Sequence, residues 1–300
     1  MPTLPWRQLR DESIARLAEA GVEDPATELR WIAERVTGRS AAEQTAHLDE
    51  PATVREVTFV DQMVGRRCQG EPLQYVLGRW AFRTLELFVD RRVLIPRPET
   101  EVVAGHALDA LDAIRAARRA AGDEAPPIAV DLGTGSGAIA LSLAAERWPH
   151  VEVWATDESA DALAVARANL SGLGRRGGVV RLVEGDWFAA LPDELRGRAA
   201  IVVSNPPYVG DAEPLPPEVG EWEPETALRA GPDGLDDVRR IVAEAPGWLA
   251  ADGALVVEIG ETQGAAVLEL AAAAGFADAR IEPDLAGRDR ALVAWRSARP

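Results

Sequence analysis

Four consecutive residues, Asn205-Pro206-Pro207-Tyr208, combine a side-chain amide, a rigid backbone and an aromatic ring directly after the apolar run 201–204. An NH₂ group with a delocalised lone pair is a poor nucleophile. The Asn205 side-chain oxygen can accept one of its N–H bonds and the Pro206 carbonyl the other, which turns the nitrogen lone pair toward an electrophile. Prolines fix φ and lack an N–H, so this carbonyl is held rigidly. Tyr208 can pack on the planar group. The pattern predicts a site for an amide or aromatic amine; a plain proline turn is the alternative.

A glycine-rich turn, Gly133-Thr134-Gly135-Ser136-Gly137, follows the apolar run 128–132 and opens a helical stretch. Glycines permit a tight turn and close approach of a ligand to the backbone. The helix N-terminus adds a weakly positive end. Asp157 ends the next predicted strand, where a carboxylate can accept hydrogen bonds from ribose hydroxyls. These residues predict a nucleoside site.

The glycine spacing fits two classes of cofactor. With Ala138 as the third small residue, it also matches the dinucleotide fingerprint. Asp131, just before the turn, favours the other class. Its carboxylate would repel a pyrophosphate but suits S-adenosylmethionine (SAM), which carries an ammonium and a sulfonium. We therefore expect SAM, with a dinucleotide or a ligand-free turn as the alternatives.

The two motifs together resemble the class I SAM-dependent methyltransferases that act on exocyclic or amide nitrogen. Further segments narrow the resemblance to the peptide chain release factor N5-glutamine methyltransferases, from about residue 10 to the C-terminus. The most specific block is 72–101. The matching segments are 72–78, 94–101, 223–224, 227–228, 233–235, 258–260, Gln263, Asp284 and 289–290.

The resemblance implies both a fold and an activity. The fold would be α/β, with a seven-stranded Rossmann-like methyltransferase sheet of strand order 3-2-1-4-5-7-6, an N-terminal helical domain and a β-hairpin linker. The activity would be methylation of the side-chain nitrogen (N5) of the glutamine in the Gly-Gly-Gln loop of release factors. We expect direct in-line displacement with no covalent enzyme intermediate, since no well-placed Cys or Lys can serve as a nucleophile, and we expect no metal.

The resemblance also assigns site residues by position. Asn205 would be catalytic, Asp186 would bond the adenine amino group and Trp187 would pack on the ring. Arg97 and Glu99 would line the site or have a structural role. The implied substrate-binding residues are Asn205, Pro206, Pro207 and Tyr208, and the implied cofactor-binding residues are Gly133, Thr134, Gly135, Ser136, Gly137, Asp157, Asp186 and Trp187.

One position departs from the family pattern. Ala230 stands before Gly231 and Pro232 where the family usually has glycine. The loop there is therefore expected to be less adaptable, which weakens the substrate assignment slightly but leaves methyl transfer unaffected.

Residues 1–72 are predicted to form a helical substrate-recognition domain, because apolar residues recur there at helical spacing. Helix start and stop signals are frequent in this stretch. They are Asp24 followed by Pro25, the glycine Gly38, and two capping boxes, Ser40 with Glu43 and Thr53 with Glu56.

Residues 73–95 are predicted to form a β-hairpin linker. Apolar and polar residues alternate over 85–89, which indicates a strand. We place the turn at 91–92 and the second strand at 93–95.

Residues 96–300 are predicted to form the methyltransferase domain, because apolar strands alternate there with helices, as in a largely parallel sheet. The last two strands are joined by the short segment 283–289 and should pair antiparallel. The long loop 206–232 is expected to be functional. The predicted strands are 128–132, 151–156, 179–183, 201–204, 254–259, 276–282 and 290–296, and the predicted helices are 101–119, 138–147, 159–171, 235–249 and 262–274.

Composition excludes several chemistries. All 32 basic residues among the 300 are Arg. Without Lys there is no Schiff-base lysine and no ordinary P-loop. The single cysteine, Cys68, excludes internal disulfides and thiolate zinc sites, and three scattered His argue against a His-rich metal site.

The net charge of −17 argues against generic nucleic-acid binding and favours a basic partner. No apolar run reaches membrane-spanning length, and residues 1–11 contain no apolar signal core. We expect a cytoplasmic monomer that binds neither membranes nor nucleic acid directly, with release factors as partners.

Two rival functions remain open at this point. The motif at 205–208 also serves adenine-N6 methyltransferases of DNA or RNA, which flip a base into the pocket. The acidic charge and the lack of an evident target-recognition domain argue against that reading. A non-catalytic SAM-binding module is the second rival, and the complete substrate motif argues against it.

Overall fold

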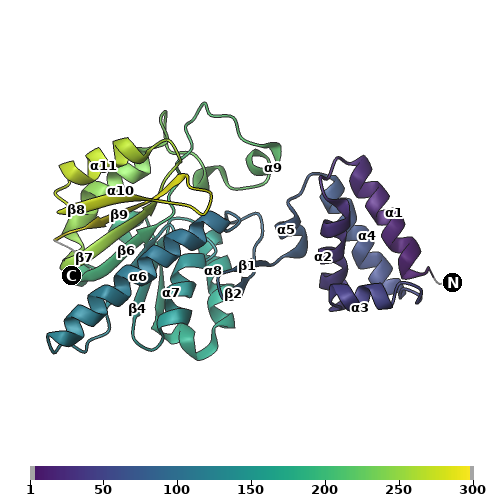
Figure 1. Ribbon diagram of the computed structural model, residues 1–300, viewed down its shortest axis with the longest axis horizontal. Coiled ribbons are helices and arrows are strands. Elements are labelled where there is room, and N and C mark those ends of the chain that lie inside the picture. Colours follow the sequence, from purple (N-terminus) through teal and green to yellow (C-terminus); the bar gives the residue numbers. More distant parts are fainter. Residues whose placement is uncertain (1–3, 298–300) are drawn as a thin grey trace. The chain divides into compact units, whose positions relative to one another are not determined.

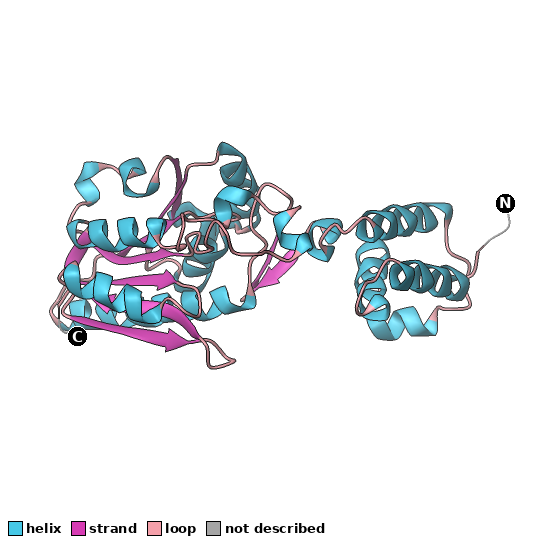
Figure 2. Cartoon of the chain, turned by 90° about the horizontal axis from the view of Figure 1, so that it is seen from above, coloured by secondary structure: helices cyan, strands magenta, loops and turns pink. Residues whose placement is uncertain are grey.

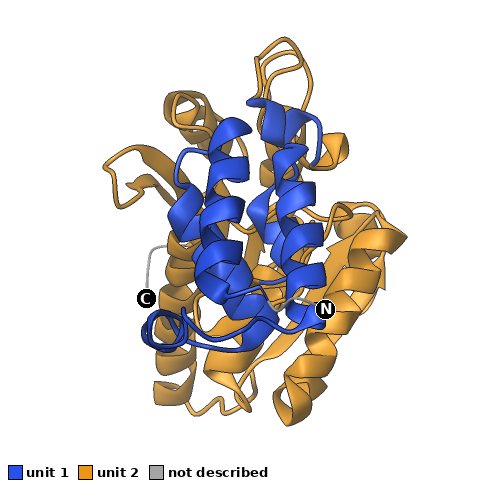
Figure 3. Cartoon of the chain, turned by 90° about the vertical axis from the view of Figure 1, so that its right-hand side faces the viewer, with its two compact units in different colours: residues 1–79, 216–222 blue, residues 80–215, 223–300 orange. Residues whose placement is uncertain are grey.

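The computed structural model describes residues 4–297, so the outermost residues of the first and last predicted domains, 1–3 and 298–300, lie outside the described residues. The chain forms two compact units, coloured separately in Figure 3. One contains residues 1–79 and 216–222, and the other contains 80–215 and 223–300. The predicted domain boundaries at 72 and 95 stay predictions.

The first unit is helical (Figure 1). Its helix boundaries follow the expected signals. The Asp24 side chain accepts a hydrogen bond from the Thr27 backbone N–H at 3.1 Å, and Gly38 ends the helix with φ +71°. Both predicted capping boxes are present. The helices are α1 (Trp6–Glu19), α2 (Pro25–Thr37), α3 (Ala41–Ala46), α4 (Val54–Cys68), α5 (Leu73–Leu77) and α9 (Pro217–Gly220).

A distant segment of the chain is fastened to this helical unit. Arg67 on α4 has a buried side chain that bonds Glu28 on α2 at 2.6 Å and Glu218 on α9 at 2.7 Å. A buried guanidinium needs such partners, because it cannot lose its charge. Part of the long loop after 205–208 therefore belongs structurally to the helices.

The second unit opens with a small hairpin of β1 (Trp80–Phe82) and β2 (Leu85–Leu87). The predicted turn at 91–92 is present, but it does not join two paired strands: the hairpin turns at 83–84, and the predicted strand at 93–95 was wrong. Backbone groups there have other partners. The Val93 N–H donates back to the Asp90 carbonyl, and the Ile95 N–H donates to the Glu223 carboxylate at 3.1 Å. With these groups satisfied, the segment needs no strand partner.

A seven-stranded sheet forms the centre of the second unit, and the predicted strand order is confirmed. The order is β5-β4-β3-β6-β7-β9-β8, in which β9 runs antiparallel to both neighbours and the other pairs are parallel. The antiparallel final pair is confirmed as well. The strands are β3 (Ile128–Leu132), β4 (Glu152–Asp157), β5 (Val180–Glu184), β6 (Ala199–Ser204), β7 (Leu249–Glu258), β8 (Asp278–Pro283) and β9 (Asp289–Trp295).

Helices cover both faces of this sheet (Figure 2). One face packs on α6 (Pro98–Ala120), α7 (Ala138–Arg147) and α8 (Ala160–Gly172), and the other on α10 (Asp236–Glu244) and α11 (Gly264–Ala273). The predicted helix 235–249 was too long. Pro246 cannot donate to a helical hydrogen bond, so α10 ends at Glu244 and a short 3₁₀ turn follows.

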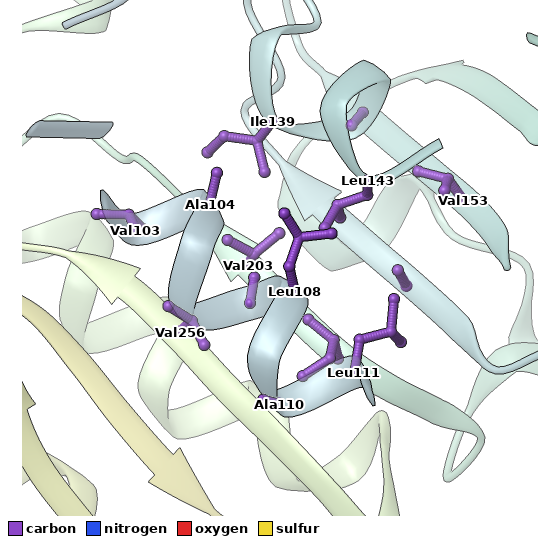
Figure 4. Close-up of a cluster of buried hydrophobic side chains, with 14 of the residues drawn as sticks. Val103, Ala104, Leu108, Ala110, Leu111, Ile139, Leu143, Val153, Val203 and Val256 are labelled. Atoms are coloured by element: carbon purple, nitrogen blue, oxygen red, sulfur yellow. The ribbon is translucent and has the colours of Figure 1, made fainter. Parts of the chain in front are cut away.

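The core explains why the strand ends are fixed. Leu108 of α6 packs with Leu143 of α7 and Val203 of β6 in one cluster (Figure 4). Every residue of β3 is buried, as expected for a central strand covered on both faces. Rigid packing holds the carboxyl ends of β3, β4 and β6 at one edge.

No helix among the described residues combines the length and apolarity needed to cross a bilayer.

Candidate active site

A cavity of about 390 Å³ lies at the carboxyl ends of β3, β4 and β6, and residues of the second unit alone line it. In a doubly wound sheet, this edge is where ligands bind. Most of the predicted site residues meet here. Those lining the cavity are Gly133, Thr134, Gly135, Ser136, Asp157, Asp186, Trp187, Asn205 and Pro207.

Three predicted residues are not part of the cavity wall: Gly137, Pro206 and Tyr208. Gly137 precedes α7 with φ +86°, and an added Cβ would come within 2.9 Å of the Leu141 side chain. Its need for glycine is therefore one of packing and backbone conformation. Tyr208 is directed to Glu258, as described below.

The glycine turn packs tightly against Trp187. Gly133 has φ +69°, and a Cβ there would lie 2.9 Å from Trp187 Cζ3. Trp187 itself has φ +42°, a conformation that is costly for a bulky residue. The strained backbone brings the indole ring onto the turn inside the cavity.

Asp157 joins the second strand to the glycine turn. One carboxylate oxygen accepts the Gly135 N–H at 2.8 Å and the other accepts the Ser159 N–H at 2.9 Å. Burial raises the pKa of Asp157, while the two backbone hydrogen bonds favour its charged form. Each carboxylate oxygen keeps a further lone pair, so Asp157 can still accept from ligand hydroxyls.

Asp131 lines the cavity, and one of its carboxylate oxygens is unpaired. Its Oδ2 accepts from the Thr134 hydroxyl at 2.7 Å and the Ala140 N–H at 3.0 Å. Its Oδ1 is buried and has no hydrogen-bond partner among the described residues. Burial raises the pKa of Asp131 to about 7, and the nearby Asp157 charge adds to the rise. The ionised form of this carboxylate, which lines the cavity, favours a cationic ligand over an anionic one.

The cavity wall is acidic overall. Its Arg92 and Arg240 are outnumbered by the five carboxylates Asp131, Asp157, Glu158, Asp186 and Asp237. Arg240 is further neutralised by Asp186 at 2.7 Å. This balance fits a cation such as SAM and opposes a pyrophosphate, so the dinucleotide alternative loses support. The Asp186 carboxylate is shared with Arg240, and its contact to an adenine amino group stays a prediction.

We expect SAM affinity to rise with pH through the titration of Asp131. The ionised fraction of Asp131, which attracts the cation, rises about fivefold between about pH 6 and pH 7. This range lies below that in which an α-amino group, such as that of SAM, titrates. Calorimetric SAM binding should strengthen by about the same factor. Asp131→Asn, checked for folding by thermal unfolding, should weaken binding and flatten this dependence. If SAM affinity in Asp131→Asn still rose with pH as steeply as in the parent, Asp131 would not be the group responsible.

A chain of hydrogen bonds anchors the motif at 205–208, and it begins at Asn205 and Thr100 on the cavity wall. The Asn205 Nδ2 donates to Thr100 Oγ1 at 3.1 Å, and Thr100 Oγ1 donates to Glu258 Oε2 at 2.7 Å. The Tyr208 hydroxyl donates to Glu258 Oε1 at 3.4 Å. Burial and the Glu258 charge raise the pKa of Tyr208.

Sequence reasoning did not assign site roles to Thr100 or Glu258. Glu258 carries a signal that could have found it, because it is the last residue of the parallel strand β7 and so belongs to the ligand edge. Thr100, in the first turn of α6, carries no such signal.

The loop after Tyr208 is held close to the site. Gln263 Nε2 donates to the Tyr208 carbonyl at 3.0 Å and to the Gly234 carbonyl at 3.1 Å. Gly234 has φ +70°, and a Cβ there would overlap the Tyr208 carbonyl oxygen. Left-handed backbone falls at Gly231 and Gly234, so alanine at position 230 meets no backbone strain.

Arg97 and Glu99 have structural partners and do not line the cavity. Arg97 pairs with the buried Glu223 at 2.5 Å, and Glu99 lies 3.6 Å from Arg288. The Arg97–Glu223 pair holds segment 94–97, whose Leu94 and Pro96 line the cavity, against the long loop.

Two family models match the chain. The PrmC N-terminal domain matches residues 8–78, and the methyltransferase small domain matches residues 123–215.

The curated relatives cover nearly the whole chain. The chain is 42% identical over 270 residues to the release factor glutamine methyltransferase of Burkholderia pseudomallei (strain K96243), covering 89% of this chain and 90% of the relative. It is 41% identical over 294 residues to that of Moorella thermoacetica (strain ATCC 39073 / JCM 9320), covering 97% and 98%. Among solved structures, the hMettl16 catalytic domain in complex with MAT2A 3′UTR hairpin 6 matches with TM-score 0.51 and 16% identity over 82% of this chain and 84% of that chain, which supports the fold alone.

Proposed function

Because this chain belongs to the release factor glutamine methyltransferase family, we propose that it methylates the side-chain nitrogen (N5) of the glutamine in the Gly-Gly-Gln loop of peptide chain release factors. The observation that carries the proposal is the position of Asn205 on the cavity that also contains the glycine turn and Asp157. A nucleoside site and an amide-recognition motif thus share one space.

The cavity residues fit the cofactor of this family. When bound, SAM supplies an electrophilic methyl group on a sulfonium. Asp131, when ionised, would attract the positive charge from its place on the cavity wall. Asp157 would accept the ribose hydroxyls, the backbone of 133–136 would allow close approach, and Trp187 would pack on the base.

The chain's contribution to chemistry is positioning. Asn205 Oδ1 would accept one N–H of the glutamine amide and the Pro206 carbonyl the other, aiming the nitrogen lone pair at the methyl carbon. The N–C bond would form as the S–C bond breaks, with its electron pair left on the now neutral sulfur, and the nitrogen would then lose a proton to water. No dedicated base is required, because the proton becomes acidic only after attack. Orientation and fixed dipoles supply the rate.

The decisive experiment compares methyl acceptors. With radiolabelled SAM, we expect transfer to a purified release factor and no transfer to DNA or RNA. A release factor with the Gly-Gly-Gln glutamine replaced by alanine should accept no label. Labelling of nucleic acid instead would favour the adenine-N6 alternative, and SAM binding without any transfer would favour a binding module.

We further propose a monomeric enzyme acting in the cytoplasm. The predicted cofactor and substrate motifs all come from the second unit of this chain, so the proposed chemistry requires no second copy. A release factor substrate supports the compartment, since translation ends there. Light scattering with and without SAM tests the oligomeric state.

A further inference from the structure

Glu258 is a fully buried carboxyl at the end of β7, next to the amide-recognition motif. It accepts hydrogen bonds from Thr100 at 2.7 Å and from Tyr208 at 3.4 Å. Thr100 is also buried, and its Oγ1 accepts from Asn205 Nδ2 at 3.1 Å. The methyl-transfer steps above leave Glu258 and Thr100 without a role.

The direction of these hydrogen bonds follows from the donors available. An ionised carboxylate only accepts, and a threonine hydroxyl has one proton to donate. Because Thr100 gives that proton to Glu258, only a lone pair of Thr100 Oγ1 faces Asn205. The Asn205 amide must therefore turn its NH₂ toward Thr100, which leaves Oδ1 free to accept from a substrate.

We propose that Glu258 and Thr100 are positioning residues that fix the rotamer of the Asn205 amide with Oδ1 available to the substrate, so that the site selects side chains that donate N–H. This inference rests on the proposed function, whose substrate is a carboxamide. A reversed Asn205 amide would present NH₂ to the substrate NH₂, and neither group could accept.

The protonation of Glu258 controls this arrangement. Burial raises the pKa of Glu258 to about 7, while the facing Arg290 on β9 lowers it and Glu99 on α6 raises it. Thr100 and Tyr208 favour the charged form through their hydrogen bonds. Once Glu258 is protonated it can donate to Thr100, and the freed Thr100 proton can turn to Asn205 Oδ1. The reversed amide then becomes accessible.

We call the hydrogen-bond chain from Glu258 through Thr100 to Asn205 the relay. Steady-state kinetics on a release factor test it. Thr100→Val should lower kcat about tenfold, the effect of losing one hydrogen bond, with SAM affinity unchanged. Thr100→Ser keeps the hydroxyl and should retain most of the rate. Thr156→Val is the matched control, because Thr156 is equally buried and its hydroxyl has no partner among the described residues. Equal losses in Thr100→Val and Thr100→Ser would overturn the proposal.

The Asn205 side-chain amide gives a readout that needs no methyl acceptor. In asparagine-¹⁵N-labelled full-length protein, its NH₂ resonances are assigned by their loss in Asn205→Ala. We expect them to shift with an apparent pKa near that of Glu258, and to be insensitive to pH in Glu258→Gln, which cannot titrate. If the Asn205 NH₂ resonances shift neither with pH nor in Thr100→Val, the relay is overturned, even if release factors are methylated. If the Asn205 NH₂ resonances shift with pH as expected but no release factor is methylated, the relay is supported and the proposed substrate is rejected.

Discussion

Asn205→Ala should lower the methylation rate of a release factor by about 10²–10³, as expected for the loss of one preorganised polar contact at the reacting group. SAM binding should change much less. Asn205 follows β6 directly, its amide is anchored on Thr100, and it lines the cavity beside the glycine turn. The variant keeps the fold of β6, because the side chain leaves the strand end. The measurement is single-turnover methyl transfer at saturating SAM.

Asn205→Asp separates the hydrogen bond that Asn205 accepts from the substrate from the hydrogen bond that it donates to Thr100. Aspartate still accepts N–H from the substrate but cannot donate to Thr100 Oγ1. We therefore expect residual activity between those of Asn205→Ala and the parent, with SAM binding retained or strengthened by attraction to the sulfonium. If Asn205→Ala methylated at a near-normal rate, the role of this motif would be refuted.

Asp157→Ala should weaken SAM binding by about 1.5–3 kcal/mol, which is the range for losing hydrogen bonds to a charged acceptor. Two effects combine in this variant. The ligand hydroxyls lose their acceptor, and the Gly135 and Ser159 backbone N–H groups lose their partner. Calorimetry measures the change, and thermal unfolding without SAM reports the part that belongs to the turn.

Asp161→Ala is the matched control for charge. Asp161 is an exposed carboxylate on α8 and is not part of the cavity wall. Its removal changes the net charge equally and should leave SAM affinity unchanged. If SAM affinity weakened equally in Asp157→Ala and Asp161→Ala, Asp157 would act only as a long-range charge. Tight NAD binding would overturn the choice of cofactor.

The sequence determined the positions at which local chemistry is strong. Pro25 after Asp24, the two capping boxes and Gly38 fixed helix boundaries, because each satisfies or ends a particular set of backbone groups. The apolar runs and the helices between them determined a parallel sheet, and the short final connection determined an antiparallel pair. The glycine turn and Asp157 could be placed at one sheet edge for the same reason.

Segments with weak local signals were decided by long-range contacts. The stretch 93–95 is apolar enough to be a strand, yet the Glu223 carboxylate takes the Ile95 N–H, and Arg97 completes the pair. Likewise, residues 216–222 continue the loop after the motif but join the helical unit through Arg67 and Glu218. Neither partner is near in sequence, so no local pattern could reveal it.

The sequence by itself determined that an amide-recognition motif and a nucleoside turn share a sheet edge, because residue types and strand order suffice for that. Only the tertiary structure decided how the motif is oriented. Thr100, Asn205 and Glu258 belong to α6, the end of β6 and the end of β7, and they meet only when the helix packs on the sheet. The unpaired Oδ1 of Asp131 was decided in the same way, since burial and the absence of a partner are properties of the packed state.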